Sequence, residues 1–345
     1  MAILPIPEIS SLRLAAVVFV VAVAIMVAAA VRFEAEAEAL SAHYDLPPLV
    51  QGSVIVAVGS SMPELFSVIV TSVTGQFDLG VGTVVGSAIF NIALIPAISG
   101  FVSNWDGPTD RLIIYKEAQF YLLAIAVTFV TFALAVIYSP TSGSSYLAGN
   151  LRPVYVALPL ALYAIYLFTQ VHDTVVADSR ASPPGDVLQA WALGIGSLLF
   201  ILVSVELLVE AVTVFTERYD VQEFLAGAII LAAVTSLPDL IMSVSASRGH
   251  RPDTSLGNVL GSNTFDLLVV IPVGVLLTGV VVINFTLAVP MFAILTLITI
   301  VLLFMLLVGM SISRREAYLL IGLYLAFVLL VLGEITGVVD LIPTV

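Results

Sequence analysis

The sequence contains one pattern of polar residues twice, 175 positions apart, inside apolar segments long enough to cross a membrane. The first copy reads AVGSSMPELFS and then VGTVVGSAIFN, and the second reads AAVTSLPDLIM and then LGNVLGSNTFD. In each copy a carboxylate directly follows a proline, at Glu64 and at Asp239. A second polar residue comes 27 positions later, at Asn91 and at Asp266. An ionisable side chain costs about 3 kcal/mol at the centre of a membrane helix, so acids placed symmetrically at mid-span predict a shared cation site.

The composition is typical of a helical membrane protein. Apolar residues make up 60% of the 345 residues and charged residues 10%, whereas soluble domains have about 25% charged residues. The apolar runs are continuous, whereas the strands of a membrane β-barrel alternate over ~10 residues. We therefore expect an all-α, multi-pass protein of the cell membrane, with the lipid bilayer as its surroundings.

The charge and the cysteine content exclude several classes of protein. The net charge of −13 makes nucleic acid an unexpected partner. Cysteine is absent, which excludes disulfides and thiolate metal sites. Motifs for phosphate loops, zinc proteases and nucleophile elbows are also absent, so we expect neither an enzyme nor a prosthetic group. Because acidic residues are abundant and Lys116 is the single lysine, we expect a prokaryotic and halophilic source.

Ten segments are long and apolar enough to cross the hydrocarbon, which takes about 20 residues. They lie at 12–33, 49–74, 78–101, 114–138, 152–171, 187–216, 222–247, 255–279, 284–309 and 316–339. Residues 1–171 and 187–345 form the two halves, and a polar linker at 172–186 joins them on the cytoplasmic side. Five spans is an odd number, so the second half enters from the opposite side and the repeat is inverted, as in many secondary transporters.

Basic residues in the loops predict the orientation, because they concentrate on the cytoplasmic side. One side holds eight of them, namely Arg32, Arg111, Lys116, Arg180, Arg248, Arg251, Arg314 and Arg315. The other side holds three, namely Arg13, Arg152 and Arg218. We therefore expect both termini to be extracellular.

Pro63 and Pro238 are expected to break the second and the seventh span. Proline has no N–H, so the carbonyl four residues earlier loses its helical donor. Irregular backbone at this depth is tolerated only beside a cavity. We therefore expect backbone carbonyls in 57–60 and 232–235 to be free to face a cation.

The second part of each copy carries polar residues four apart, which share one face of a helix. These pairs are Ser87 with Asn91 and Ser262 with Asp266. Hydroxyl, amide and carboxylate oxygens are hard ligands that suit sodium, potassium and calcium better than zinc or copper.

Each feature also has a purely structural interpretation. A proline can simply kink a membrane helix, and a serine can bond back to its own helix. The pairs Gly82/Gly86 and Gly257/Gly261 favour close helix packing over ligand binding. A structural role for Glu64 would be an ion pair with a basic side chain, but no Lys or Arg lies inside a predicted span core. The duplication in register therefore favours a site.

At these residues the chain resembles the sodium/calcium exchanger branch of the calcium:cation antiporter superfamily. The motifs GSSMPELFS…GTVVGSAIFN and VTSLPDL…GNVLGSNTFD carry the resemblance, within cassettes at 50–98 and 225–272. The pieces GSAIFN, PDL and GSNTFD are most similar to potassium-dependent sodium/calcium exchangers. The resemblance implies ten spans, a monomer that is a complete transport unit, and electrogenic exchange of sodium for calcium with potassium co-transport.

Site roles follow from the resemblance by position. It implies that Glu64 and Asp239 are the central calcium and sodium ligands and that Asn91 and Asp266 flank them, with Asp266 linked to potassium. It also implies neutral oxygen ligands at Ala57, Ser60, Ser61, Ser87, Ala232, Thr235, Ser236 and Ser262. The chain departs from the family at Ser60, commonly threonine, and at Asp239, a glutamate in many prokaryotic members.

Three alternatives remain open at this point. A calcium/proton exchanger of the same superfamily typically carries a GNxxE pattern in the repeats, which fits this chain less well. A passive cation channel would not need inverted symmetry. An intramembrane aspartyl protease needs a GxGD-type setting, whereas Asp239 lies in SLPDL.

Overall fold

The computed structural model of the chain describes residues 9, 11–44, 56–103, 113–141, 147–172, 185–248 and 252–339. The helices and strands in these ranges are α1 (Leu12–His43), α2 (Val56–Ser60), α3 (Met62–Thr74), α4 (Phe77–Ser103), η2 (Ile113–Glu117), α5 (Ala118–Tyr138), β1 (Ala148–Leu151), α6 (Pro153–His172), α7 (Val187–Tyr219), α8 (Glu223–Ala226), η3 (Gly227–Leu231), α9 (Ala232–Thr235), α10 (Leu237–Arg248), α11 (Pro252–Phe265), η4 (Asp266–Val270), α12 (Ile271–Thr278), β2 (Val281–Asn284), α13 (Phe285–Gly309) and α14 (Arg314–Ile335). The η elements are single π-helical turns.

The fold is that of a helical membrane protein, as the sequence predicts. Within the described ranges, eight helices are long and apolar enough to cross a membrane, and a bent pair from Glu223 to Arg248 raises the number to nine. The apolar helix α3 is shorter. Residues 45–55, directly before α2, lie outside the described residues, and so does most of the predicted linker at 172–186.

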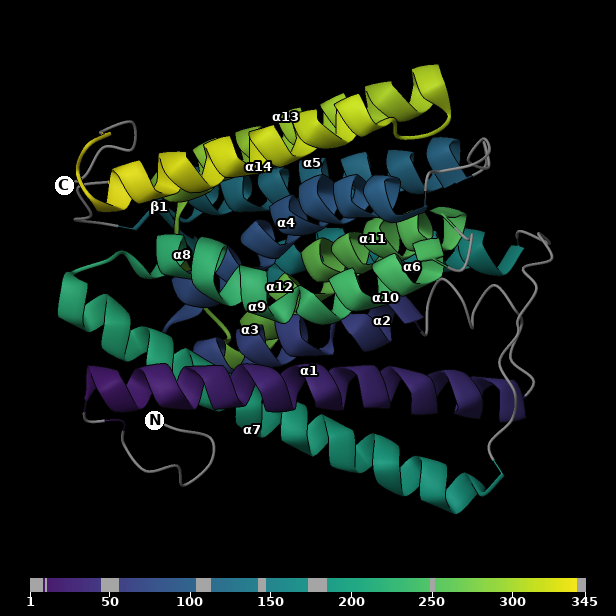
Figure 1. Cartoon of the computed structure of the whole chain (residues 1–345). Coiled ribbons are helices and arrows are strands. Elements are labelled where there is room, and N and C mark those ends of the chain that lie inside the picture. Colours follow the sequence, from purple (N-terminus) through teal and green to yellow (C-terminus); the bar gives the residue numbers. More distant parts are fainter. Residues whose placement is uncertain are drawn as a thin grey trace.

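The helices form layers around a buried centre (Figure 1). Helices α1 and α7 pack against each other along one side, and α13 and α14 lie on the opposite side. Helix α4 runs between these layers and contacts α3, α8, α10, α11, α13 and α14. Of its most apolar 18 residues 89% are buried, whereas the value for α1 is 28%, so α4 is the central helix and α1 faces the surroundings.

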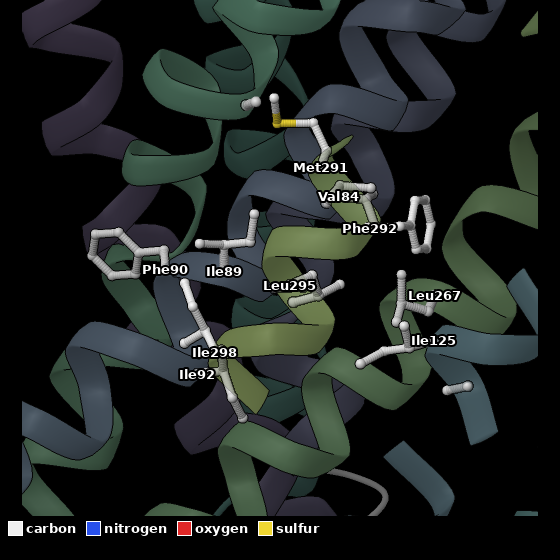
Figure 2. Close-up of a cluster of buried hydrophobic side chains, with 14 of the residues drawn as sticks. Val84, Ile89, Phe90, Ile92, Ile125, Leu267, Met291, Phe292, Leu295 and Ile298 are labelled. Atoms are coloured by element: carbon white, nitrogen blue, oxygen red, sulfur yellow. The ribbon is translucent and has the colours of Figure 1, made fainter. Parts of the chain in front are cut away.

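The largest apolar cluster packs α4 against α13 and η4 (Figure 2). Ile89 and Ile92 of α4 lie beside Leu295 and Ile298 of α13, and all four are fully or almost fully buried. In a membrane, lipid tails are as apolar as these side chains, so little hydrophobic driving force brings helices together. Packing of this kind stabilises the contact mainly through van der Waals attraction. The cluster therefore holds α4, the helix that carries Ser87 and Asn91, in a fixed position.

Two local features differ from the predicted spans. A short antiparallel ribbon pairs β1 with β2, from Ala148 opposite Asn284 to Leu151 opposite Val281, where only loops are predicted. Helix α1 continues to His43, ten residues past the predicted end of the first span. The reason is the segment FEAEAEAL at 33–40, whose alanines, leucine and glutamates are strong helix formers.

Glycines let the two halves of the chain approach closely. A Cβ atom at Gly82 would overlap the backbone of Phe224, and one at Gly86 would overlap the backbone of Ala228. The packing interpretation of this glycine pair is therefore confirmed. At Gly257 a Cβ atom would meet nothing within 4 Å, so packing does not explain that position.

This contrast gives a matched pair of variants. We expect Gly86→Ala to lower the free energy of unfolding by about 1–3 kcal/mol or to block folding, because backbone must move. Gly257→Ala should not lower stability and should raise it slightly, because the added methyl meets nothing and alanine is the better helix former. Thermal unfolding of the purified proteins in detergent measures the difference, and equal melting temperatures for the two variants would contradict the packing.

Candidate cation-binding site

The chain breaks its helix at both predicted places. Helix α2 ends at Ser60 and α3 begins at Met62, and the second break separates α9 from α10 at Ser236. The axis bends by 42° at the second break. Each proline is the second residue of the helix after the break, a position where a missing N–H costs least. The following acid, Glu64 or Asp239, therefore lies in the first turn of a new helix.

The expectation of free carbonyls is wrong for Ala57 and Ala232. The Ala57 carbonyl accepts the N–H of Ser61 at 3.3 Å, and the Ala232 carbonyl accepts the N–H of Ser236 at 3.1 Å. The reason is the register, because each proline removes the donor of the carbonyl four residues earlier, on Gly59 or Val234. Ser60 and Thr235 also donate their hydroxyls to these carbonyls, at 3.3 and 3.4 Å.

The twelve predicted site residues are all buried. Exposure is at most 3% for each of Ala57, Ser60, Ser61, Glu64, Ser87, Asn91, Ala232, Thr235, Ser236, Asp239, Ser262 and Asp266. None of the three acids forms a salt bridge within the described part of the chain. Three carboxylates in the interior of a membrane protein without a basic partner are therefore a costly arrangement.

Glu64 is connected to the second half of the chain through Ser87. The Ser87 hydroxyl donates to Glu64 Oε1 at 3.1 Å, and it lies 2.7 Å from the hydroxyl of Ser236 at the second break. Ser87 therefore does not bond back to its own helix. Ser262, its counterpart in the second copy, does so, because its hydroxyl donates to the Val259 carbonyl at 3.3 Å.

Asp239 is connected to the first half through Asn91. The Asn91 amide donates to Asp239 Oδ2 at 2.7 Å and to Asn263 Oδ1 at 3.1 Å. Asn263 in turn donates to the Ala88 carbonyl at 3.2 Å and to the Tyr121 hydroxyl at 3.1 Å. The two copies therefore meet at one place, where polar groups of α4 contact both the second break and α10.

Asp266 begins the π-helical turn η4, and neither of its oxygens accepts a hydrogen bond from the described residues. It is close enough to Glu64 and Asp239 for the three charges to repel one another, and the Ser61 hydroxyl lies near it without forming a hydrogen bond. A local widening of a helix of this kind is frequent at functional sites.

The site has oxygen atoms available for a cation. Besides both oxygens of Asp266, the atoms without a hydrogen-bond partner among the described residues include Glu64 Oε2, Asp239 Oδ1, Asn91 Oδ1 and Ser61 Oγ. Buried polar atoms are normally paired, so this concentration fits a ligand. No three acidic or histidine side chains in the described ranges converge as a metal cluster by themselves. A cation held here therefore needs serine, asparagine and backbone oxygens as well, a ligand set that suits sodium or calcium.

Sequence reasoning missed three polar residues near the site. Asn263 was hidden because the first copy has Ala88 at the matching position, so no repeated signal marks it. Tyr121 lies on α5, outside both copies. Glu34 was placed beyond the end of the first span, whereas the longer α1 carries it into the protein interior with 1% exposure.

Comparisons with known proteins show which family and which fold the chain is similar to. The family described as sodium/calcium exchanger protein matches residues 14–172 and 189–333. The inner membrane protein YrbG of Escherichia coli is 28% identical over 250 residues, which are 70% of this chain and 73% of the relative. The sodium/calcium exchanger MaX1 of Methanosarcina acetivorans is 24% identical over 325 residues, 86% of this chain and 92% of the relative.

Solved structures share the fold. The sodium-calcium exchanger NCX_Mj gives a TM-score of 0.62 at 23% identity and covers 92% of this chain and 99% of its own. The H⁺/Ca²⁺ exchanger CAX gives a TM-score of 0.69 at 18% identity and covers 94% of this chain and 85% of its own.

The unpaired oxygens lead to a prediction on stability. Calcium at about 100 times its dissociation constant should stabilise the protein by about 2.7 kcal/mol, and chelation should remove this gain. Glu64→Gln should abolish the calcium-dependent rise in melting temperature, because a central negative charge is lost. Glu217→Gln, which removes an exposed charge at the end of α7, should keep the rise. A calcium effect that survives in Glu64→Gln would place the ion elsewhere.

Proposed function

The chain belongs to the sodium/calcium exchanger protein family, within the calcium:cation antiporter superfamily, and from this premise we propose that it exchanges sodium for calcium across the membrane. The observation that carries the proposal is the meeting of the two copies at α4. Ser87 links Glu64 to Ser236, and Asn91 binds Asp239. One cation bound between these groups takes ligands from both halves of the chain.

Competition for the shared oxygens would couple the two fluxes. Two carboxylates with neutral oxygens can hold one divalent ion or more than one monovalent ion, but not both together. An exchanger needs this exclusion, because sodium and calcium must occupy the site in turn. One kind of ion is released on one side of the membrane before the other kind binds there. Sodium moving down its gradient would then drive calcium out of the cytoplasm. The relative MaX1, which covers most of this chain, is named a sodium/calcium exchanger.

We propose ten spans in two inverted halves, with both termini extracellular. The start of α1 and the end of α14 lie at the same end of the bundle in Figure 1. The long helices α1 and α7 occupy matching positions at the start of each half and pack together on one side. The pair α2 and α3 then forms the described part of the second span.

Alternating access would follow from movement of these two helices. Much of the surface of α1 and α7 faces the surroundings, whereas α4 and the span from α11 to α12 are buried. A sliding or rocking pair of outer helices could open one side of the site and then the other while the ligands stay in place. This division of a transporter into a fixed and a moving part is common among inverted repeats.

Sodium coupling has a direct test. Vesicles that contain the pure protein should take up calcium when a sodium gradient is imposed, and Glu64→Ala should abolish the uptake. Full activity in Glu64→Ala would refute the assignment. Uptake driven by a pH gradient without sodium would favour a proton-coupled exchanger, whose fold CAX shares. Flux that persists with no sodium or potassium on the opposite side would favour a channel.

Potassium co-transport is the finer part of the proposal and depends on Asp266. Its two oxygens have no hydrogen-bond partner among the described residues, so both are available to a separate monovalent ion. We expect calcium transport by the unmodified protein to need potassium, and Asp266→Asn to remove that requirement while retaining exchange. Calcium uptake measured with and without potassium decides it, and an unmodified protein indifferent to potassium would contradict the proposal.

A further inference from the structure

Glu34 is a buried acid on the outer helix α1, outside both copies of the repeated pattern. Its exposure is 1%, and neither carboxylate oxygen has a hydrogen-bond partner among the described residues. Arg32, the nearest basic residue along the helix, forms a 2.6 Å ion pair with Glu36 on another face of α1. Within the described part of the chain, Glu34 is therefore a buried acid without a partner.

The surroundings of Glu34 join it to the candidate site. A Cβ atom built on Gly59, just before the first break, would stand 3.9 Å from Glu34 Cγ. Pro63 has no N–H to donate to the Gly59 carbonyl, so this carbonyl lacks its usual helical donor. Glu34 also lies close enough to Asp239 for the two charges to repel each other. Helix α1 contacts both α2 and α10, the helices that precede the first break and follow the second.

The acids of α1 lead from the surface to this point. Glu38 lies one turn beyond Glu34 on the same helix face and is exposed. Glu38 and Glu34 thus place two carboxylates along one face of α1, and α1 contacts α10, the helix that carries Asp239.

We propose that Glu34 binds the transported cation on its way between the end of α1 and the central site, as a separate station for calcium or sodium. This inference rests on the proposed exchange function and adds a residue to it. The station uses the Glu34 carboxylate with backbone oxygen of the α2 segment, and it passes the ion to Asp239. Because Glu34 lies on α1, a movement of that helix changes the distance between the station and the site.

The test compares Glu34→Gln with Glu36→Gln, a substitution two residues away that removes the ion pair with Arg32 from another face of α1. Sodium-driven calcium uptake is measured against calcium concentration in inside-out and right-side-out membrane vesicles. Calcium is first presented on the side of the membrane where α1 ends, at His43. From that side, Glu34→Gln should raise the half-saturating calcium concentration about tenfold. The maximal rate should stay within about twofold of that of the unmodified protein. From the other side the curve should match that of the unmodified protein. Glu34→Asp, which keeps the charge, should give a smaller rise.

The alternatives have separate signatures. If Glu64→Ala is inactive but Glu34→Gln behaves like Glu36→Gln from both sides, the station is wrong and the exchange function stands. An equal change from both sides, or a Glu34→Gln protein that fails to fold, would show a structural role and overturn the station. Retained exchange in Glu64→Ala would instead overturn the proposed function.

Discussion

The burial of carboxylates away from water is the constraint on which the rest of this structure depends. Glu64, Asp239 and Asp266 are fully buried and have no salt-bridge partner among the described residues. A buried, unpaired charge costs several kcal/mol unless it is neutralised by a partner. Serine and asparagine donors satisfy only one oxygen each of Glu64 and Asp239 and none of Asp266. A mobile cation is the partner that fits a transporter, because it can neutralise these groups and then leave.

The backbone prepares the site by ending helices inside the protein. A proline in the first turn after each break allows an acid to project from the start of a new helix. The positive end of the helix dipole lies there and favours negative charge. Close contact at Gly82 and Gly86 then brings α4 against the broken span of the other half. Side chains of α4 can therefore reach the second break and α10, so the candidate site includes residues of both halves.

The sequence was sufficient for the main features of the fold because strong signals mark them. Long apolar runs predicted the membrane helices, and the duplicated proline-acid pairs predicted both breaks. The contacts of Ser87 and Asn91 across the halves agree with a shared site, although their role as ligands stays a prediction. The β1–β2 ribbon, by contrast, depends on pairing between residues at least 130 positions apart, which no local pattern reveals.

Other site features could not be predicted because they depend on exact register or on tertiary contacts. The Ala57 and Ala232 carbonyls keep their donors because the helix continues to the break, so the freed carbonyls lie two residues later. Asn263 reaches Asn91 only through the packing of α11 on α4. The burial of Glu34 depends on the continuation of α1 and on its contact with α2, neither of which follows from hydropathy.

The most direct test of the central claim is to locate the ion. Crystals soaked with strontium, a heavier stand-in for calcium, would show its position as a peak in an anomalous difference map. The account predicts a peak between the carboxylates of Glu64 and Asp239, reduced when sodium is present in excess. A peak at a distant position, or well-ordered Glu64 and Asp239 side chains with no peak between them at saturating strontium, would contradict it.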